Sequence, residues 1–191
     1  MIKIGLVGRN GSGKSSVCEY LAQKGFLVYS LSDSLREVAF SQNIPLDRDH
    51  LIELGTTLKA KEGSEVLAKR MWEKASLDTH DLSINGQVFD SIRLPEEATF
   101  LKQKGVHMVA IEVPIQERYQ RIRLRNRETD HISFETFQEQ EAKEDAGKGQ
   151  NLVATRACCE WVWTNDQTPA HLFAQIDAWI SGYKKEHQCQ S

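Results

Sequence analysis

Residues 8–15 read GRNGSGKS, the most informative segment of the chain. It matches the phosphate-binding loop pattern G-x-x-x-x-G-K-[ST]. The apolar run Ile2–Val7 before it is suited to a buried strand. A helix is expected after it, ending at the glycine signal Lys24-Gly25. The apolar face of that helix consists of Val17, Cys18, Leu21 and Ala22. A strand, a glycine-rich loop and a helix in this order predict a binding site for nucleoside triphosphate.

The residue types of the loop explain its chemistry. Glycine residues let backbone N–H groups point into a concave nest, and the following helix directs the positive end of its dipole there. We expect Lys14 to reach the β- and γ-phosphates of ATP and the Ser15 hydroxyl to ligate Mg²⁺. The alternative is a glycine turn that binds no ligand. The predicted nucleotide-binding residues of the loop are Gly8, Asn10, Gly11, Ser12, Gly13, Lys14, Ser15 and Ser16.

Length and composition are those of one ordinary domain. The 191 residues are 40% hydrophobic and 27% charged, with a net charge of −3 and a pI near 6.1. We therefore expect a single P-loop domain over residues 1–191, as a monomer or homodimer. Because the net charge is slightly negative, we expect the chain to bind neither nucleic acid nor a membrane surface.

The number and spacing of the cysteines indicate the redox state of the cellular compartment. Four cysteines lack the spacing of a disulfide framework, which favours a reduced, cytoplasmic protein without a leader. Cys158 and Cys159 lie in an apolar segment, so we expect them to serve the core rather than a metal site.

Short apolar runs alternate with helical patterns, which predicts a parallel sheet with helices on both faces. Asn85-Gly86 leaves a second possibility, a hairpin between residues 82–84 and 87–90. The predicted strands are residues 2–7, 26–30, 87–90, 106–113 and 161–164.

Two insertions interrupt this core. The first, residues 31–80, contains Pro45 and Gly63, which predict three short helices over 31–41 and 47–75. We expect it to cover an acceptor. The second, residues 126–150, is dense in charge, and we expect it to act as a lid over the triphosphate. The other predicted helices are residues 95–104, one starting at 115, 134–145 and one starting at 169.

Asp33 and Arg36 follow the second predicted strand, at the edge where open α/β sheets bind ligands. Asp33 can hold a Mg²⁺-bound water or accept a proton, and Arg36 can bind an acceptor phosphate. The alternative is a helix start in which Ser32 or Asp33 is the cap and Arg36 is exposed.

Asp90 ends the third predicted strand, and Arg93 follows three residues later. A carboxylate at this place is expected near the metal ion of a phosphate loop, so Asp90 and Ser15 are the predicted Mg²⁺ ligands. Arg93 is expected to face the same cleft and to contact the acceptor together with Asp90.

Phosphoryl transfer needs positive charge around the moving group. We expect Arg121 and Arg125 to supply it, because i, i+4 spacing places them together at the cleft end of one helix. The alternative is a solvated face paired with Glu117, Glu128 and the acidic helix that follows. The cluster contains Arg118, Arg121, Arg123, Arg125 and Arg127. Asn165, after the last predicted strand, either contacts the nucleotide base or belongs to an ordinary turn.

These residues resemble motifs of small-molecule P-loop kinases of the nucleoside monophosphate kinase group, including archaeal-type nucleotide kinase-like and dephospho-CoA kinase-like proteins. Asp33-x-x-Arg36 resembles the acceptor-site G-D-x-x-R motif, with Ser32 in place of glycine. Residues 90–93 resemble the D-G-x-x-R element, with Ser91 in place of glycine.

The resemblance extends to the lid and the fold. Arg121 and Arg125 match the lid arginines in their spacing from Pro114, and Asn165 falls at the polar residue after the last strand. The resemblance implies a three-layer α/β P-loop NTPase fold whose five-stranded parallel sheet has the order 2-3-1-4-5. It also implies ATP and Mg²⁺ as cofactors.

Three functions remain open at this point. We favour transfer of the γ-phosphoryl of ATP to a small phosphorylated acceptor, in first place a nucleoside monophosphate, with Lys14, Asp33, Arg121 and Arg125 as catalytic residues. A dephospho-CoA kinase must deprotonate a ribose hydroxyl, which favours a pair of aspartates where this chain has only Asp33. A regulatory NTPase is the third possibility, although the N-K-x-D motif of GTPase switch proteins is absent.

Overall fold

Five parallel strands form the centre of the computed structural model, which describes residues 1–78, 84–125, 131–146 and 149–188. Their order is β2-β3-β1-β4-β5, so the predicted order 2-3-1-4-5 is confirmed. The bounds are β1 Ile2–Val7, β2 Phe26–Ser30, β3 Gly86–Asp90, β4 His107–Glu112 and β5 Trp161–Thr164. Three of them start and end where the sequence predicts, β3 starts one residue earlier, and β4 is one residue shorter at each end.

Strand β3 has parallel neighbours on both edges. Its first residue, Gly86, lies opposite Ile2 of β1 and Phe26 of β2. A strand has only two edges, so no antiparallel partner can join β3. The hairpin alternative at Asn85-Gly86 is therefore wrong, although residues 82 and 83 lie outside the described part of the chain.

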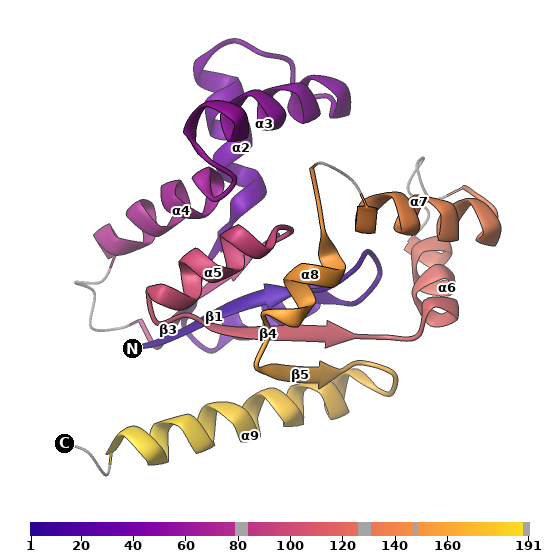
Figure 1. Ribbon diagram of the computed structural model, residues 1–191. Helices are drawn as coiled ribbons and strands as arrows, with labels where there is room; N and C mark the ends of the chain where they lie inside the picture. Colours follow the sequence, from indigo (N-terminus) through magenta and orange to yellow (C-terminus); the bar gives the residue numbers. More distant parts are fainter. Residues whose placement is uncertain (79–83, 126–130, 147–148, 189–191) are drawn as a thin grey trace.

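Helices cover both faces of the sheet (Figure 1). On one face α1 (Lys14–Gln23) and α9 (Pro169–Gln188) pack through Leu21, Leu172 and Ile176. On the other lie α4 (Val66–Leu77), α5 (Pro95–Gln103) and the short α8 (Leu152–Ala157). The sequence does not predict α8. The three-layer α/β architecture is thus confirmed.

Some core assignments need correction in detail. Val17 and Leu21 of α1 are buried as expected, whereas Ala22 is exposed. Cys158 and Cys159 are half-buried and pack against the core under α5, as the sequence predicts. Thr168 caps α9 by accepting a hydrogen bond from the His171 amide at 3.3 Å, as expected from Thr168-Pro169.

The two insertions form separate layers beyond the sheet. Helices α2 (Leu31–Ser41) and α3 (Arg48–Glu62) precede α4, so the division of the first insertion into three helices is confirmed. Helices α6 (Ile115–Arg125) and α7 (Phe134–Ala146) lie beyond the carboxyl end of β4 (Figure 1). The cleft edge of the sheet is therefore flanked by α2 and α3 on one side and by α6 and α7 on the other.

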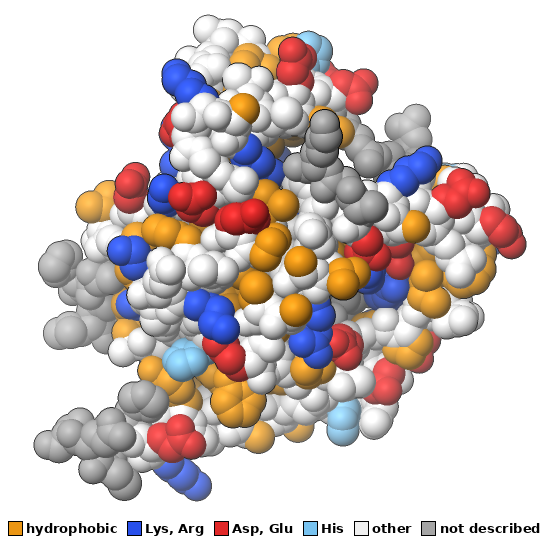
Figure 2. Space-filling model, in the orientation of Figure 1, with side chains coloured by type: hydrophobic (Ala, Val, Ile, Leu, Met, Phe, Trp, Pro, Cys, Tyr) orange, Lys and Arg blue, Asp and Glu red, His pale blue; other side chains and the backbone are white. Residues whose placement is uncertain are grey.

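The outer surface carries mixed charge. On the face seen in Figure 2, Lys and Arg side chains alternate with Asp and Glu, and no continuous basic area is visible. Within the described ranges, no helix combines the length and apolar character that crossing a bilayer requires.

Candidate functional site

The loop between β1 and α1 has the backbone of a phosphate-binding loop. Gly11 and Gly13 have φ values of 77° and 92°, in the left-handed region that glycine adopts without strain. Helix α1 begins at Lys14 directly after Gly13. Lys14 Nζ donates to the carbonyl oxygens of Gly8 at 2.5 Å and Arg9 at 3.4 Å, so the lysine lies over its own loop.

The other predicted loop residues fall into two groups. Asn10, Ser15 and Ser16 are exposed, and Ser12 is buried. The Ser12 carbonyl accepts a hydrogen bond from the Asn165 side-chain amide at 2.9 Å. Exposed hydroxyls at the start of α1 are available to a ligand, whereas Ser12 helps to fix the loop.

Lys14 shares its environment with the end of β3. Burial lowers the pKa of Lys14, the Asp90 carboxylate raises it, and the Arg93 guanidinium lowers it further. The structure thus brings together three predicted residues from β1–α1 and β3–α5, close enough for their charges to interact. Their separation in sequence is about 80 residues, and the parallel pairing of β1 and β3 is what unites them.

Asp90 has one carboxylate oxygen without a partner. Its Oδ1 is buried and accepts no hydrogen bond among the described residues, while its Oδ2 accepts one from Ser91 Oγ at 3.3 Å. A buried, unpaired carboxylate oxygen is costly unless a cation or a donor completes it. Together with the exposed Ser15 at the start of α1, this fits the oxygen ligands that Mg²⁺ prefers. The described ranges contain no cluster of three His, Cys, Asp or Glu side chains, so phosphate oxygens would have to complete such a site.

Three serine hydroxyls meet at the ends of β2 and β3. Ser30 Oγ lies 2.8 Å from Ser32 Oγ and 3.0 Å from Ser91 Oγ. Ser91 has φ 64°, an uncommon value for a residue other than glycine. The serines that replace the motif glycines thus link the Asp33-x-x-Arg36 segment to the Asp90 segment.

The two predicted acceptor arginines differ in their partners. Arg36 Nη1 donates to Asp33 Oδ1 at 2.7 Å, and both side chains are more than half exposed. The guanidinium of Arg93 is exposed and has no hydrogen-bond or ion-pair partner in the described part of the chain. The proposed cap by Ser32 or Asp33 is wrong, because α2 begins at Leu31 and Ser30 precedes it.

Glu97 is a site residue that sequence reasoning missed. Its buried Oε2 accepts the backbone amides of Arg93 at 2.8 Å and Leu94 at 3.1 Å, and burial raises its pKa while these amides lower it. The Arg93 carbonyl in turn accepts from the Asn151 amide at 2.9 Å. A glutamate at the third helical position is a known N-terminal signal, and Pro95-Glu96-Glu97 carries it.

Arg121 and Asn165 border a cavity of about 500 Å³ beside the loop. Arg121 Nη2 donates to the Asn165 carbonyl at 2.7 Å. The cavity is also lined by Gly13, Ser16 and Gln167, with Phe173 stacked on Tyr20 at 4.0 Å between ring centroids. Its position beside the loop suits a nucleotide base, and the role of Asn165 as a base contact stays a prediction.

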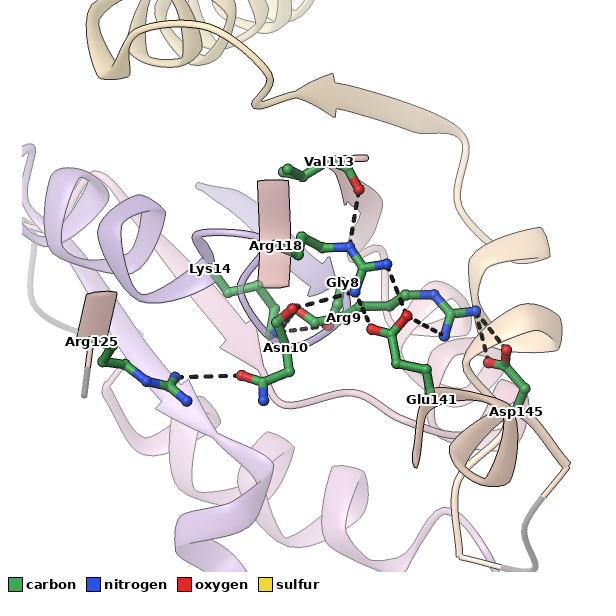
Figure 3. A network of polar contacts seen from close by, with 9 residues as sticks. All are labelled: Gly8, Arg9, Asn10, Lys14, Val113, Arg118, Arg125, Glu141 and Asp145. Atoms are coloured by element: carbon green, nitrogen blue, oxygen red, sulfur yellow. Dashed lines mark hydrogen bonds and ion pairs between the residues drawn. The ribbon is translucent and has the colours of Figure 1, made fainter. Parts of the chain in front are cut away.

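Two further arginines of α6, Arg118 and Arg125, contact Asn10 of the loop (Figure 3). Arg125 Nη1 donates to Asn10 Oδ1 at 3.4 Å. Arg118 is buried and pairs with Glu141 of α7. The alternative of pairing with the acidic helix therefore holds for Arg118, which sequence reasoning did not select. Arg127 and Glu128 lie outside the described residues.

Helix α7 lies against the phosphate loop in this structure. Arg9 Nη2 donates to both oxygens of Asp145, at 2.8 and 2.7 Å. The lid motion expected of residues 126–150 stays a prediction, and residues 126–130 and 147–148 lie outside the described part. His131 is exposed, as expected for a surface residue.

Comparison with known proteins agrees with this geometry. Residues 4–147 match the model of a family described as AAA domain. A UPF0200 protein of Hyperthermus butylicus is 31% identical over 150 residues, which cover 78% of each chain. Among solved structures, TT1252 from Thermus thermophilus has a TM-score of 0.63 at 22% identity, covering 95% of this chain and 97% of that one. A shikimate kinase from Acinetobacter baumannii in complex with shikimate has a TM-score of 0.56 at 18% identity, covering 97% and 95%. At these identities the solved structures establish the P-loop kinase-type fold alone.

Proposed function

The chain belongs to the AAA domain family and to the UPF0200 proteins, and from this premise we propose that it transfers the γ-phosphoryl group of ATP to a small phosphorylated acceptor. The acceptor that we favour is a nucleoside monophosphate. The observation that carries the proposal is the meeting of Lys14, Asp90 and Arg93 at the carboxyl ends of β1 and β3. A phosphate loop that only binds nucleotide does not need an arginine after the neighbouring strand that has no partner among the described residues.

The donor side binds and orients ATP. The loop amides and the start of α1 hold the β- and γ-phosphates. Lys14 exchanges its contacts with the Gly8 and Arg9 carbonyls for phosphate oxygens. The base occupies the cavity beside Arg121 and Asn165. Arg125, which already reaches Asn10 of the loop, adds positive charge to the transferring group.

Ser15 and Asp90 are the residues that would hold Mg²⁺, because the Ser15 side chain is exposed at the start of α1 and the buried Asp90 Oδ1 has no hydrogen-bond partner in the described part of the chain. When bound, the ion neutralises charge that develops on the phosphate oxygens. The Lys14 ammonium shares this neutralisation.

The acceptor side clamps a second phosphate. Arg93 and Arg36 follow neighbouring strands, and an arginine can bind a phosphate through two parallel hydrogen bonds. An acceptor phosphate is already ionised at pH 7 and needs no base. A hydroxyl acceptor, as in a dephospho-CoA kinase, would need Asp33 as the base, and Asp33 is paired with Arg36. This pairing favours the phosphate acceptor.

A coupled assay of ADP release tests the proposal. ATP is supplied with Mg²⁺, and nucleoside monophosphates and dephospho-CoA are added one at a time. Stimulation by a monophosphate supports the proposal, and stimulation by dephospho-CoA identifies the hydroxyl acceptor instead. Turnover that no acceptor changes would identify a regulatory NTPase. A thermal-shift screen with an ATP analogue and the same panel gives an independent answer, because a true acceptor raises Tm by mass action.

A further inference from the structure

Arg118 connects three segments that meet at the phosphate loop. Its Nε donates to the Val113 carbonyl at 3.0 Å, at the end of β4, and its Nη1 donates to the Asn10 carbonyl at 3.4 Å, in the loop. Both terminal nitrogens also donate to the carboxylate of Glu141 on α7, Nη2 at 2.9 Å. The side chain is 6% exposed. One guanidinium therefore contacts the residue that follows β4, the loop and α7 at the same time (Figure 3).

The carboxylates of α7 extend this contact to a second loop residue. Glu141, whose side chain is 8% exposed, lies between Arg118 and Arg9, with 3.9 Å from its Oε2 to Arg9 Nη1. Asp145 holds the other end of Arg9 at 2.7 Å. The ring of Phe137 packs 5.8 Å from the Arg118 guanidinium carbon. Two arginines and two carboxylates thus fix the loop at consecutive residues, Arg9 and Asn10.

The tip of the loop also rests on the backbone of Arg118. A Cβ added to Gly11 would lie 2.8 Å from the Arg118 carbonyl oxygen and 3.2 Å from its Cα. Such a distance leaves no room for any other side chain at Gly11. The loop therefore takes its shape from contact with α6 as well as from its own glycines.

We propose that Arg118 is a positioning residue of the phosphate loop, which it holds in the shape that binds ATP before ATP arrives. This inference rests on the proposed function. Binding and transfer need the loop amides at fixed places, and displacement of a binding group by about 1 Å can cost about a hundredfold in rate. A buried ion pair is poor evidence for stability, since its desolvation offsets its attraction. The geometry instead indicates that the pair of Arg118 and Glu141 maintains the conformation of the loop.

Two variants separate positioning from folding. Arg118→Lys keeps the positive charge beside Glu141. Its single ammonium group, however, cannot donate to Val113, Asn10 and Glu141 together as the planar guanidinium does. The double variant Arg118→Met/Glu141→Met removes both charges, so no buried charge is left unpaired. Arg70→Met is the matched control, because Arg70 of α4 forms an exposed pair with Glu62 of α3. All three are first compared by thermal unfolding.

The decisive measurement is the Kd for ATP with Mg²⁺ by calorimetry, followed by kcat and the KM of the acceptor. We expect Arg118→Lys and the double variant to raise the Kd for ATP and lower kcat, each by about tenfold or more, with the acceptor KM unchanged. The control should match the wild type. Variants that bind ATP as tightly as the wild type overturn the positioning role alone. A wild-type protein that binds no ATP overturns the proposed function as well.

Discussion

The two sides of the phosphate loop differ in how their charged groups are paired. On the donor side, Lys14 lies on loop carbonyls, Arg9 on Asp145 and Arg118 on Glu141. These partners all belong to the protein. On the acceptor side, by contrast, Arg93 and one oxygen of Asp90 have no partner within the described ranges.

This difference indicates two ways of preparing a site. The donor side is held in shape by the protein itself, which lowers the reorganisation needed when triphosphate binds. The proposed acceptor side would be completed only by its ligand, and Asp33 and Arg36 there are exposed. The phosphates of ATP would meet a fixed loop, whereas the acceptor would meet groups that it must itself bring together.

The largest effect should follow from the donor side. We predict that Lys14→Met lowers turnover by a few hundredfold, because loss of one donor to the transition-state charge costs about 3 kcal/mol. The fold should remain, since burial already disfavours the charged form of Lys14. The measurement is steady-state kinetics together with thermal unfolding. Lys24→Met, which removes a surface lysine paired with Asp177, is the control. Near wild-type turnover of Lys14→Met would contradict the role of the loop.

Substitutions on the acceptor side should change the KM of the acceptor rather than the turnover. We predict that Arg93→Met raises the acceptor KM by about ten- to a hundredfold, because a hydrogen bond to a charged group contributes about 1.5–3 kcal/mol. Arg36→Met should have a smaller effect, since its guanidinium already binds Asp33. The KM for ATP should stay within about twofold in both variants. Arg70→Met is the control. A normal acceptor affinity by calorimetry in both site variants would show that these arginines do not bind its phosphate.

The left-handed backbone conformation of Ser91, on the acceptor side, should lower the stability of the protein. At Ser91, with φ 64°, glycine should be more stable than alanine by about 1 kcal/mol, because a left-handed conformation costs roughly that much with a side chain. At Ser32, inside α2, the order should reverse, since alanine is the better helix former by about 1 kcal/mol. Urea unfolding of Ser91→Gly, Ser91→Ala, Ser32→Gly and Ser32→Ala measures the difference in free energy of unfolding at each position. The same order at the two positions would refute the strain at Ser91.

The smallest change is expected in α7. Because Glu141 and Asp145 hold α7 on the loop, amides of residues 134–146 should be protected without nucleotide. An ATP analogue should change their hydrogen exchange by less than about twofold. The lid expectation gives the opposite result, with fast exchange in the free protein and slow exchange once ATP analogue and acceptor are bound. Hydrogen-exchange mass spectrometry decides between a fixed wall and a moving lid.

Much of the fold could be predicted because its signals are local. The strands are short apolar runs, and Pro45 and Gly63 mark the breaks in the first insertion. Helix α8 was missed although Asn151, whose side chain accepts the Ala154 amide at 3.0 Å, is a typical cap. Its apolar sequence is equally compatible with a strand or a loop in the core, and only the packing against β1 and α5 separates them.

The candidate site could be predicted only in part. Lys14, Asp90 and Arg93 follow from motif positions, and the sheet brings them together. Among the arginines of residues 118–127, the sequence offers five similar candidates. Burial distinguishes Arg118, and that burial depends on Glu141, 23 residues away. The base contact of Asn165 stays a prediction, and its side chain also donates to the Ser12 carbonyl, 153 residues away, which the local pattern does not indicate.

The phosphate loop, the parallel α/β sheet and the two insertions can be read from the amino-acid sequence, because glycine conformation, apolar periodicity and helix signals act within a few residues. Which charged side chains find partners within the protein, and which do not, is settled by the folded arrangement. That outcome depends on burial and on partners distant in the chain, and neither is recorded in the local pattern.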